Sequence, residues 1–148
     1  MIEFAITVFT FILMEGVAWF AHKYIMHGFL WSLHRDHHQP GEGFFERNDF
    51  FFLIFAIPAV MCFIAGMNNL YFFAVGLGIA LYGLGYFTVH DIIIHQRFRM
   101  LRRWNNRYVT GIRRAHKMHH KHLGKHEGEN FGMLLVPMKY FKLNKTLE

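Results

Sequence analysis

Three long apolar runs constrain the fold of this chain more than any other feature. They cover residues 2–21, 50–67 and 70–89, and the only charged residues within them are Glu3 and Glu15 in the first run. About 20 apolar residues at a rise of ~1.5 Å each cross a hydrocarbon layer ~30 Å thick, so each run is long enough for a spanning helix. A helix buried in a soluble bundle normally keeps a polar stripe, which the second and third runs lack. The sequence therefore predicts an all-α integral membrane protein with about three spanning helices.

Histidine is the second constraint, because ten of the twelve histidines fall into four clusters. In chain order the clusters have the spacings H-x4-H, H-x2-H-H, H-x4-H and H-x2-H-H. Their members are His22, His27, His34, His37, His38, His90, His95, His116, His119 and His120. Imidazole is a common metal ligand, and each H-x4-H pair begins where an apolar run ends. We therefore predict a metal site at a membrane boundary, with His122 and His126 outside it as surface residues.

The runs and clusters form an internal half-repeat. An apolar run, an H-x4-H pair, a connection and an H-x2-H-H triplet occur over residues 2–38 and again over residues 70–120. The run at 50–67 is then the return crossing between the two copies. No Ser-rich or Pro-rich linker separates them, so we expect a single domain over residues 1–148. The only cysteine, Cys62, excludes a disulfide or a cysteine-based metal site within one chain.

Helix geometry predicts how the clusters face a metal. On an α-helix that advances ~100° per residue, positions i, i+3 and i+4 share a face, so each triplet can face an ion. The two histidines of an H-x4-H pair lie ~140° apart on an ideal α-helix. They reach one ion equally only with a helix end, a bulge or a kink. This geometry favours pairs whose members touch different ions or different sides of a cleft.

The number of histidines indicates two metal ions. Ten ligands exceed what one transition-metal ion binds and suit two ions with about five each, less any position held by water or oxygen. Imidazole binds zinc, copper, iron and nickel, so the ligand type leaves the metal open. The H-E-x-x-H motif of zinc hydrolases is absent, as is the Glu and E-x-x-H pattern of carboxylate-bridged di-iron bundles. We therefore predict a dinuclear site built from histidines.

Acidic side chains near the clusters can orient imidazoles by accepting a hydrogen bond from the ring nitrogen that does not bind metal. Asp36 lies within the first triplet and Asp91 follows His90, so these two are the preferred candidates. Other acids nearby in the sequence are Glu42, Glu46, Asp49, Glu127 and Glu129. For Glu42 and Glu129, a solvated loop acid is an equally good interpretation.

Basic residues predict the orientation, because Lys and Arg near membrane ends favour the cytoplasmic side. They occur at Lys23, Arg35 and Arg47 and at ten positions between 97 and 125, and none lies in the turn at 68–69. We expect the amino terminus outside, and the carboxyl terminus and all four clusters on the cytoplasmic face. Topology thus explains the pI near 9.7 without a nucleic-acid partner, and anionic lipid is an expected contact.

Smaller features of the sequence bear on packing and closure. In the third run, Ala74 and Gly78 are four apart, as are Gly76 and Ala80, with Gly83 and Gly85 beyond. Small residues at this spacing let helix backbones approach closely in lipid, which is the favoured interpretation; a slot for a long thin substrate is the alternative. The apolar segment 131–136 is too short to cross a membrane, and we expect it to lie in the interface and close one side of the site.

The motifs also resemble a known family. The stretches AHKYIMHGFLWSLHRDHH, VHDIIIHQR and AHKMHHKHLGKHEGENFGMLLVP are similar to those of bacterial β-carotene hydroxylases, members of the membrane fatty acid hydroxylase and sterol desaturase superfamily. The resemblance spans residues 14–137, and all four clusters occur in the family's order. The family's iron ligands correspond to the ten histidines named above, and none is missing.

The resemblance implies a non-haem di-iron monooxygenase of the bacterial cytoplasmic membrane. Such an enzyme places a hydroxyl on carbon 3 of a β-ionone ring with dioxygen and two electrons, expected from a ferredoxin. Acting on both rings, it turns β-carotene through β-cryptoxanthin into zeaxanthin. A site at the inner membrane surface suits this reaction, because the carotenoid arrives from the bilayer and the electrons from a soluble donor.

Three other functions remain as alternatives. Another membrane oxygenase, such as a carotenoid ketolase, a desaturase or a fatty acid or sterol hydroxylase, shares the histidine content but differs in cluster spacing. A zinc or copper transporter or sensor would place polar ligands within its spans, and the uncharged cores of the second and third runs contain none. A purely structural membrane protein would leave ten ordered histidines without a purpose.

Overall fold

The computed structural model describes residues 1–39, 43–98 and 100–142. Within these residues it contains helices and no strand, as predicted. The α-helices are α1 (Ile2–Phe20), α2 (Trp31–His38), α3 (Phe52–Ala65), α4 (Leu70–Phe87) and α5 (Arg107–His120). Two π-helical segments, η1 (Ala21–Phe29) and η3 (Thr88–Ile94), continue α1 and α4, and the 3-10 turns are η2 (Arg47–Phe51) and η4 (Met138–Phe141).

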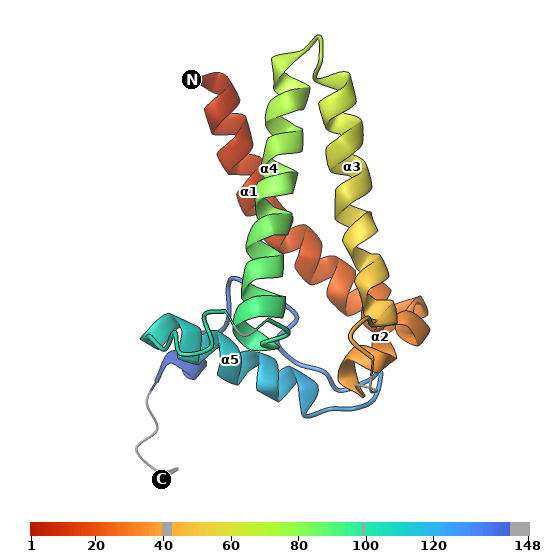
Figure 1. Cartoon of the computed structure of the whole chain (residues 1–148), viewed down its shortest axis with the longest axis vertical. Helices are drawn as coiled ribbons and strands as arrows, with labels where there is room; N and C mark the ends of the chain where they lie inside the picture. The colour runs from red at the N-terminus through yellow and green to blue at the C-terminus, as the bar shows by residue number, and fades with distance from the viewer. Residues whose placement is uncertain (40–42, 99, 143–148) are drawn as a thin grey trace.

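Three helical rods are long and apolar enough to cross a membrane, which confirms the predicted number. They cover Ile2–Phe29, Arg47–Ala65 and Leu70–Ile94. Figure 1 shows the amino terminus and the turn between α3 and α4 at one end of these rods, and α2 and α5 at the other. All four histidine clusters therefore lie at the same end of the molecule. The half-repeat is also visible, because a long helix, a π-helical segment and a separate helix follow one another in each copy.

The central rod, α4, packs closely against both neighbours through its small residues. A side-chain carbon added to Gly78 would lie 2.6 Å from Cβ of Thr10 and 2.8 Å from the carbonyl oxygen of Thr7 in α1. One added to Gly76 would lie 3.1 Å from the carbonyl oxygen of Ala59 in α3. The approach at Gly78 leaves no room for a side chain, and that at Gly76 is tight, so close helix packing is confirmed as the use of these two small residues.

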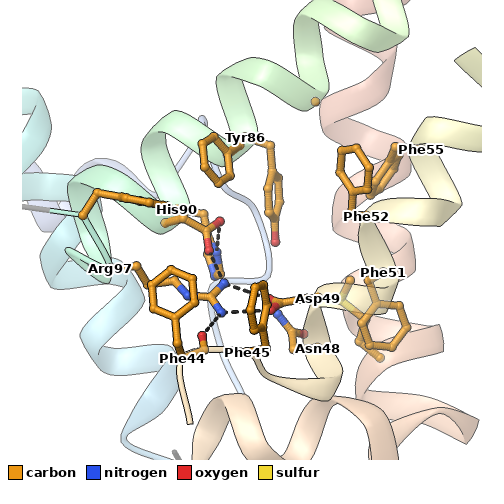
Figure 2. Close-up of a pocket in the computed structure, with 15 residues that line it drawn as sticks. Phe44, Phe45, Asn48, Asp49, Phe51, Phe52, Phe55, Tyr86, His90 and Arg97 are labelled. Carbon is orange, nitrogen blue, oxygen red and sulfur yellow. Dashed lines mark hydrogen bonds and ion pairs between the residues drawn. The ribbon is translucent and has the colours of Figure 1, made fainter. Parts of the chain in front are cut away.

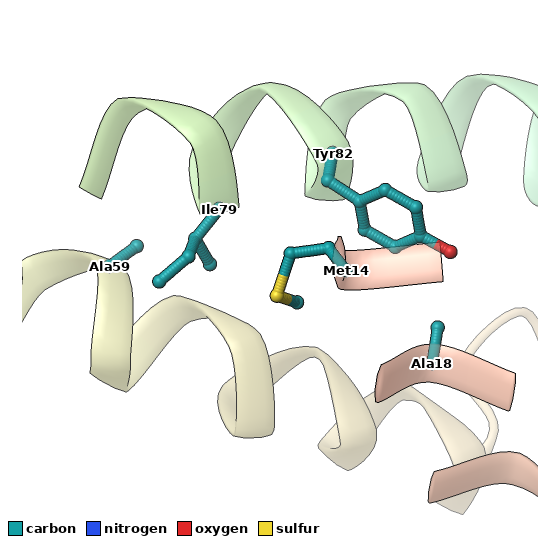
Figure 3. Packing of buried hydrophobic residues seen from close by; sticks show 5 residues of the cluster. All are labelled: Met14, Ala18, Ala59, Ile79 and Tyr82. Atoms are coloured by element: carbon teal, nitrogen blue, oxygen red, sulfur yellow. The ribbon is translucent and has the colours of Figure 1, made fainter. Parts of the chain in front are cut away.

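A compact apolar core joins the three rods (Figure 3). Its buried members are Met14, Ala18, Ala59, Ile79 and Tyr82, which come from α1, α3 and α4. Tyr82 has no exposed surface, and its hydroxyl donates a hydrogen bond of 2.8 Å to Glu15. The tyrosine can be buried because its one polar atom has a partner.

Glu15, the charge in the middle of α1, ties the segment 131–136 to the rods. Its carboxylate accepts hydrogen bonds from the backbone N–H groups of Met133, Leu134 and Leu135 at 2.9–3.0 Å. Three backbone donors and the Tyr82 hydroxyl compensate the cost of placing a carboxylate within an apolar helix. The segment is thereby held against α1 beside the histidine clusters.

Asparagine caps fix the starts of α4 and α5. The side-chain oxygen of Asn69 accepts from the N–H of Tyr71 at 2.9 Å, and that of Asn106 accepts from Val109 at 2.8 Å. Each cap satisfies a backbone donor that has no partner within the helix. The cap at Asn106 sets where α5 begins, and Val109 and Ile112 then pack with Ile93 of η3. These contacts hold α5 against the end of the second half-repeat.

Candidate metal centre

The two H-x4-H pairs lie on π-helical segments. In η1 the N–H of Leu30 bonds to the carbonyl of Ile25, and at the end of η3 the N–H of His95 bonds to the carbonyl of His90, in both cases five residues back. A π-helix brings residues i and i+5 to the same side. The separation of each pair expected from α-helical angles is therefore not observed: His22 and His27 lie in one group of imidazoles, and His90 and His95 lie in another, because the π-helical turn is the exception that the spacing argument allowed.

The structure gathers nine of the ten predicted histidines into two groups of ring nitrogens, each within 4.8 Å of one another. The first group comprises His22, His27, His34, His38 and His119, and the second comprises His37, His90, His95 and His116. The groups adjoin, since the rings of His34 and His37 are 5.4 Å apart. Each H-x2-H-H triplet thus contributes to both groups. The helical-face argument had instead predicted that the three imidazoles of a triplet form one cluster.

The internal repeat explains this division. Aligning the two copies pairs His34 with His116, His37 with His119, and His38 with His120. The middle histidine of each triplet crosses to the other group: His37 joins the second, and His119 joins the first. The two copies therefore exchange one imidazole each.

By the same correspondence, His120 is the candidate for a fifth member of the second group, although its ring also stacks on that of His38 of the first group at 4.5 Å. Its ring lies 4.7 Å from that of His37, 5.1 Å from that of His95 and 4.5 Å from that of His116. Its Nε2 is buried and has no hydrogen-bond partner among the described residues. A buried, unpaired acceptor is costly unless something binds it, so His120 fits the role of a metal ligand.

Backbone carbonyls fix the orientation of four rings in the first group. The Nδ1 atoms of His22, His27, His38 and His119 lie 2.9–3.1 Å from carbonyl oxygens of Phe131, Lys125, His122 and Glu129. Because a carbonyl only accepts, Nδ1 carries the proton in each neutral ring, and Nε2 keeps a lone pair. The carbonyls thus leave the Nε2 lone pairs of these four rings directed toward the centre of the first group.

The distances between these lone pairs suit a bound cation. Nε2 of His27 lies 3.1 Å from Nε2 of His38 and 3.3 Å from Nε2 of His119. These contacts are not hydrogen bonds, since neither nitrogen carries a proton in the tautomers set by the carbonyls. Two nitrogens bound to one ion at ~2.1 Å and ~90° to each other lie ~3.0 Å apart. The residues present therefore fit a transition metal.

Side chains from the segment 46–49 and from η3 orient three further rings. Asn48 Oδ1 lies 2.6 Å from Nδ1 of His34, and Glu46 lies 2.8 Å from Nδ1 of His37. Asp91 lies 3.2 Å from Nδ1 of His90 and also accepts from Arg97 at 2.7 Å. The predicted role of Asp91 in orienting an imidazole thus agrees with its position.

Asp36 does not take the role expected of it. Its Oδ2 accepts from the backbone N–H of Arg47 at 2.6 Å, and its Oδ1 has no partner in the described part of the chain. Asp36 lies between Arg35 and His37 on α2, and it makes no hydrogen bond to an imidazole of the described residues. Glu46, named in the sequence only as a nearby acid, has the contact instead. Glu42 lies outside the described residues.

Several other positions complete the comparison with the sequence. Glu129 contributes its backbone carbonyl, while its carboxylate accepts from Lys139 at 3.0 Å. His122 likewise contributes a carbonyl, and neither its side chain nor that of His126 belongs to the two groups. Spacing gives no signal for a carbonyl or for Asn48, because such contacts depend on how the loops fold back.

Burial keeps the imidazoles outside the spanning rods neutral. It lowers the pKa of His95 to about 2, of His120 to about 3 and of His38 to about 4, each from an ordinary value of 6.5. Neighbouring imidazoles lower these values further, because two cationic rings would repel. Burial also raises the pKa of the Glu46 carboxyl. The rings therefore offer lone pairs and not charges near neutral pH, as metal ligands must.

Comparison with known proteins agrees with this site. The family described as fatty acid hydroxylase has a model that matches residues 7–141. A beta-carotene hydroxylase of Pantoea ananas is 42% identical over 141 residues, 93% of this chain and 79% of the relative. A beta-carotene hydroxylase of Pseudescherichia vulneris is 39% identical over 132 residues, 87% of this chain and 74% of the relative.

A plant relative shows the same likeness over a smaller part of its length. Beta-carotene hydroxylase 1, chloroplastic, of Capsicum annuum is 38% identical over 129 residues, 84% of this chain and 40% of the relative. No solved structure matches the chain. The resemblance predicted from the histidine motifs is confirmed by these relatives.

Proposed function

This chain belongs to the fatty acid hydroxylase family, and from that premise we propose that it is a carotenoid β-ring 3-hydroxylase. It converts β-carotene through β-cryptoxanthin to zeaxanthin with dioxygen as co-substrate. The observation that carries the proposal is the pair of adjoining histidine groups at the end of three apolar rods. The names of the bacterial relatives supply the substrate class.

The proposed cofactor is a pair of iron ions, one in each group. Five imidazoles, from His22, His27, His34, His38 and His119, hold the first, and His37, His90, His95, His116 and His120 hold the second. When bound, the irons supply the oxygen chemistry needed to attack an unactivated ring C–H bond. Two electrons per turnover come from a donor of the ferredoxin type.

The protein's own residues position the ligands and keep water out. Carbonyls of the segment 122–131 hold the Nδ1 protons of the first group, and Glu46, Asn48 and Asp91 face Nδ1 of three others. The ring of Phe131 packs 5.2–5.5 Å from those of His22, His27 and His119 and covers that side of the site. Excluding water confines the reaction to the bound ring.

The proposed location is the bacterial cytoplasmic membrane, with the amino terminus outside and the metal centre on the cytoplasmic side. The basic residues at 97–125, beside the α5 clusters, support this orientation through the positive-inside rule. The carotenoid then enters from the bilayer, and the electron donor docks from the cytoplasm.

Production of the protein in a bacterial host that accumulates β-carotene tests the function. Chromatography of the extracted pigments should show β-cryptoxanthin and zeaxanthin, and the purified protein should contain about two irons per chain. His119→Ala should leave β-carotene unchanged, whereas His126→Ala, an exposed histidine outside both groups, should not alter the products. If the iron-loaded, intact chain leaves β-carotene unchanged, the proposal that β-carotene is its substrate is refuted.

The same experiment distinguishes the proposed carotenoid hydroxylase from other membrane oxygenases. The matching family takes its description from fatty acid hydroxylation, so a hydroxylase of fatty acids is the second candidate. Hydroxylated fatty acids in the host lipids together with unchanged β-carotene would favour it. Keto-carotenoids would instead indicate a ketolase.

A further inference from the structure

A cavity of about 480 Å³ opens beside the second histidine group. It lies between α3, α4 and the segment 44–51 that precedes α3 (Figure 2). Its lining includes Phe52 and Phe55 from α3, and Gly83, Tyr86 and Phe87 from α4. His90 is the one predicted ligand among the lining residues described. The cavity therefore connects the apolar rods to the second group directly through His90, while Asn48 and Phe51 of its lining contact His34 of the first group.

The cavity faces the surface that the spanning rods present to lipid. Phe52 is 66% exposed and Phe87 is 41% exposed, and each belongs to an apolar rod long enough to span. A molecule dissolved in the bilayer can therefore reach the cavity without crossing water. An aromatic lining beside lipid selects an apolar occupant.

The volume limits how much of such a molecule enters. A volume of 480 Å³ corresponds to a cube about 8 Å on edge, whereas a long carotenoid is comparable with the ~30 Å thickness of the hydrocarbon layer. One ring end with a short part of the chain fits, and the rest stays in lipid. This arrangement also lets each end of a symmetric substrate enter in turn.

The polar end of the cavity is closed by paired charges. Arg97 donates to Asp49 and Asp91 at 2.7 Å each and to the carbonyl of Phe44 at 2.6 Å (Figure 2). The guanidinium also lies 5.4 Å from the centre of the Phe44 ring. Arg97 thus fastens the aromatic segment at 44–45 over the cavity. Its charge is compensated by two carboxylates and is not directed at an occupant.

Gly83 leaves the space in which a ring can lie. A side-chain carbon added at Gly83 would meet no atom within 4 Å, although Gly83 lines the cavity. Gly76 and Gly78 on the same helix differ, because an added carbon there would press on α3 or α1. The absence of a side chain at Gly83 therefore enlarges the cavity and is not required for close packing of α4 against its neighbours.

We propose that this cavity binds the cyclic end of the carotenoid against the second histidine group, and that Gly83 determines which ring fits. The inference rests on the proposed function and extends it to a binding site and a specificity-determining position. A larger side chain at position 83 would occupy the space proposed for the carotenoid ring, and it would not replace a ligand histidine.

The first test compares Gly83→Leu with Gly16→Leu in the β-carotene host. Gly16 is also a glycine of a spanning helix with open space around an added carbon, but it does not line the cavity. At equal protein amount and iron content, Gly83→Leu should lower hydroxylated product at least tenfold, Gly83→Ala should lower it less, and Gly16→Leu should leave it unchanged. Conversion by iron-loaded Gly83→Leu at the level of the parent chain overturns the proposal.

A second test does not depend on turnover or on the folding of the leucine variant. Gly83→Cys in a Cys62→Ala background is alkylated in vesicles by a lipid-soluble maleimide, with and without β-carotene in the bilayer. Bound ring should slow alkylation at least fivefold, and Gly16→Cys should react equally in both. Equal rates at position 83 overturn the cavity assignment. Protection at position 83 in a chain that gives no hydroxylated product retains the binding site and refutes only the proposed reaction.

Discussion

The orientation and tautomer of each imidazole depend on the group that its Nδ1 atom contacts. Carbonyl oxygens hold four Nδ1 protons of the first group, and Asn48, Glu46 and Asp91 face three more rings. A carbonyl admits one neutral tautomer, whereas a carboxylate also stabilises a protonated ring. The first group is therefore fixed by neutral partners, and the second has two acids beside it.

His120 provides the sharpest prediction for a single residue. Its Nε2 is buried and has no hydrogen-bond partner in the part of the chain that the structure describes, and the repeat pairs it with His38 of the first group. We expect His120→Ala to lower iron from about two to about one per chain and to abolish hydroxylation. Metal analysis of the purified protein checks this, with His126→Ala as the control that keeps both irons. Two irons and normal products in His120→Ala would contradict the correspondence between the copies.

Acid should destabilise the metal-free protein. Burial lowers the pKa of His38 to about 4 and of His120 to about 3, below the ordinary 6.5. Below about pH 6.5 the unfolded chain then binds more protons than the folded chain, so stability is lost as the pH falls. The apparent Tm of chelator-treated protein should drop by about 5 °C or more between about pH 7 and about pH 5.

A matched variant checks the source of this pH effect. His120→Leu removes one titrating ring and should show a smaller drop in Tm, whereas the exposed His126→Ala should match the parent chain. A Tm that stays constant or rises on acidification would show that the buried imidazoles do not control stability.

At the scale of elements, the π-helical segments place two histidines that are five residues apart on the same side of the helix. The angles of an α-helix place His90 and His95 ~140° apart, yet both belong to the second group. The sequence shows the spacing but not the bond from His95 back to His90, because that bond depends on tertiary contacts. Ile93, buried against Val109 and Ile112 of α5, is one such contact.

For the whole molecule, the orientation in the membrane is the prediction that matters for electron supply. In a Cys62→Ala background, Asn68→Cys lies in the turn between α3 and α4, and Lys121→Cys follows α5 at the other end. An impermeant maleimide added to spheroplasts should label position 68 at once and position 121 only after lysis. Labelling in the reverse order would place the metal centre outside.

The sequence predicts the architecture well and the details of the site less well. Apolar length alone marks the three rods, and the i, i+3, i+4 rule places both triplets on helices. Asn48 and the Phe131 carbonyl could not be found this way, since their contacts with His34 and His22 arise when loops fold back. Asp36 was chosen because it lies within the first triplet, but neighbouring positions on a helix point in different directions.

The exchange of His37 and His119 bears on how the protein is made. During synthesis the first half-repeat supplies four imidazoles of the first group, but the remaining one, His119, comes only with α5 of the second half-repeat. A translation product truncated before α5 leaves both groups incomplete. A complete set of ligands in either group therefore exists only when the second half-repeat has folded against the first.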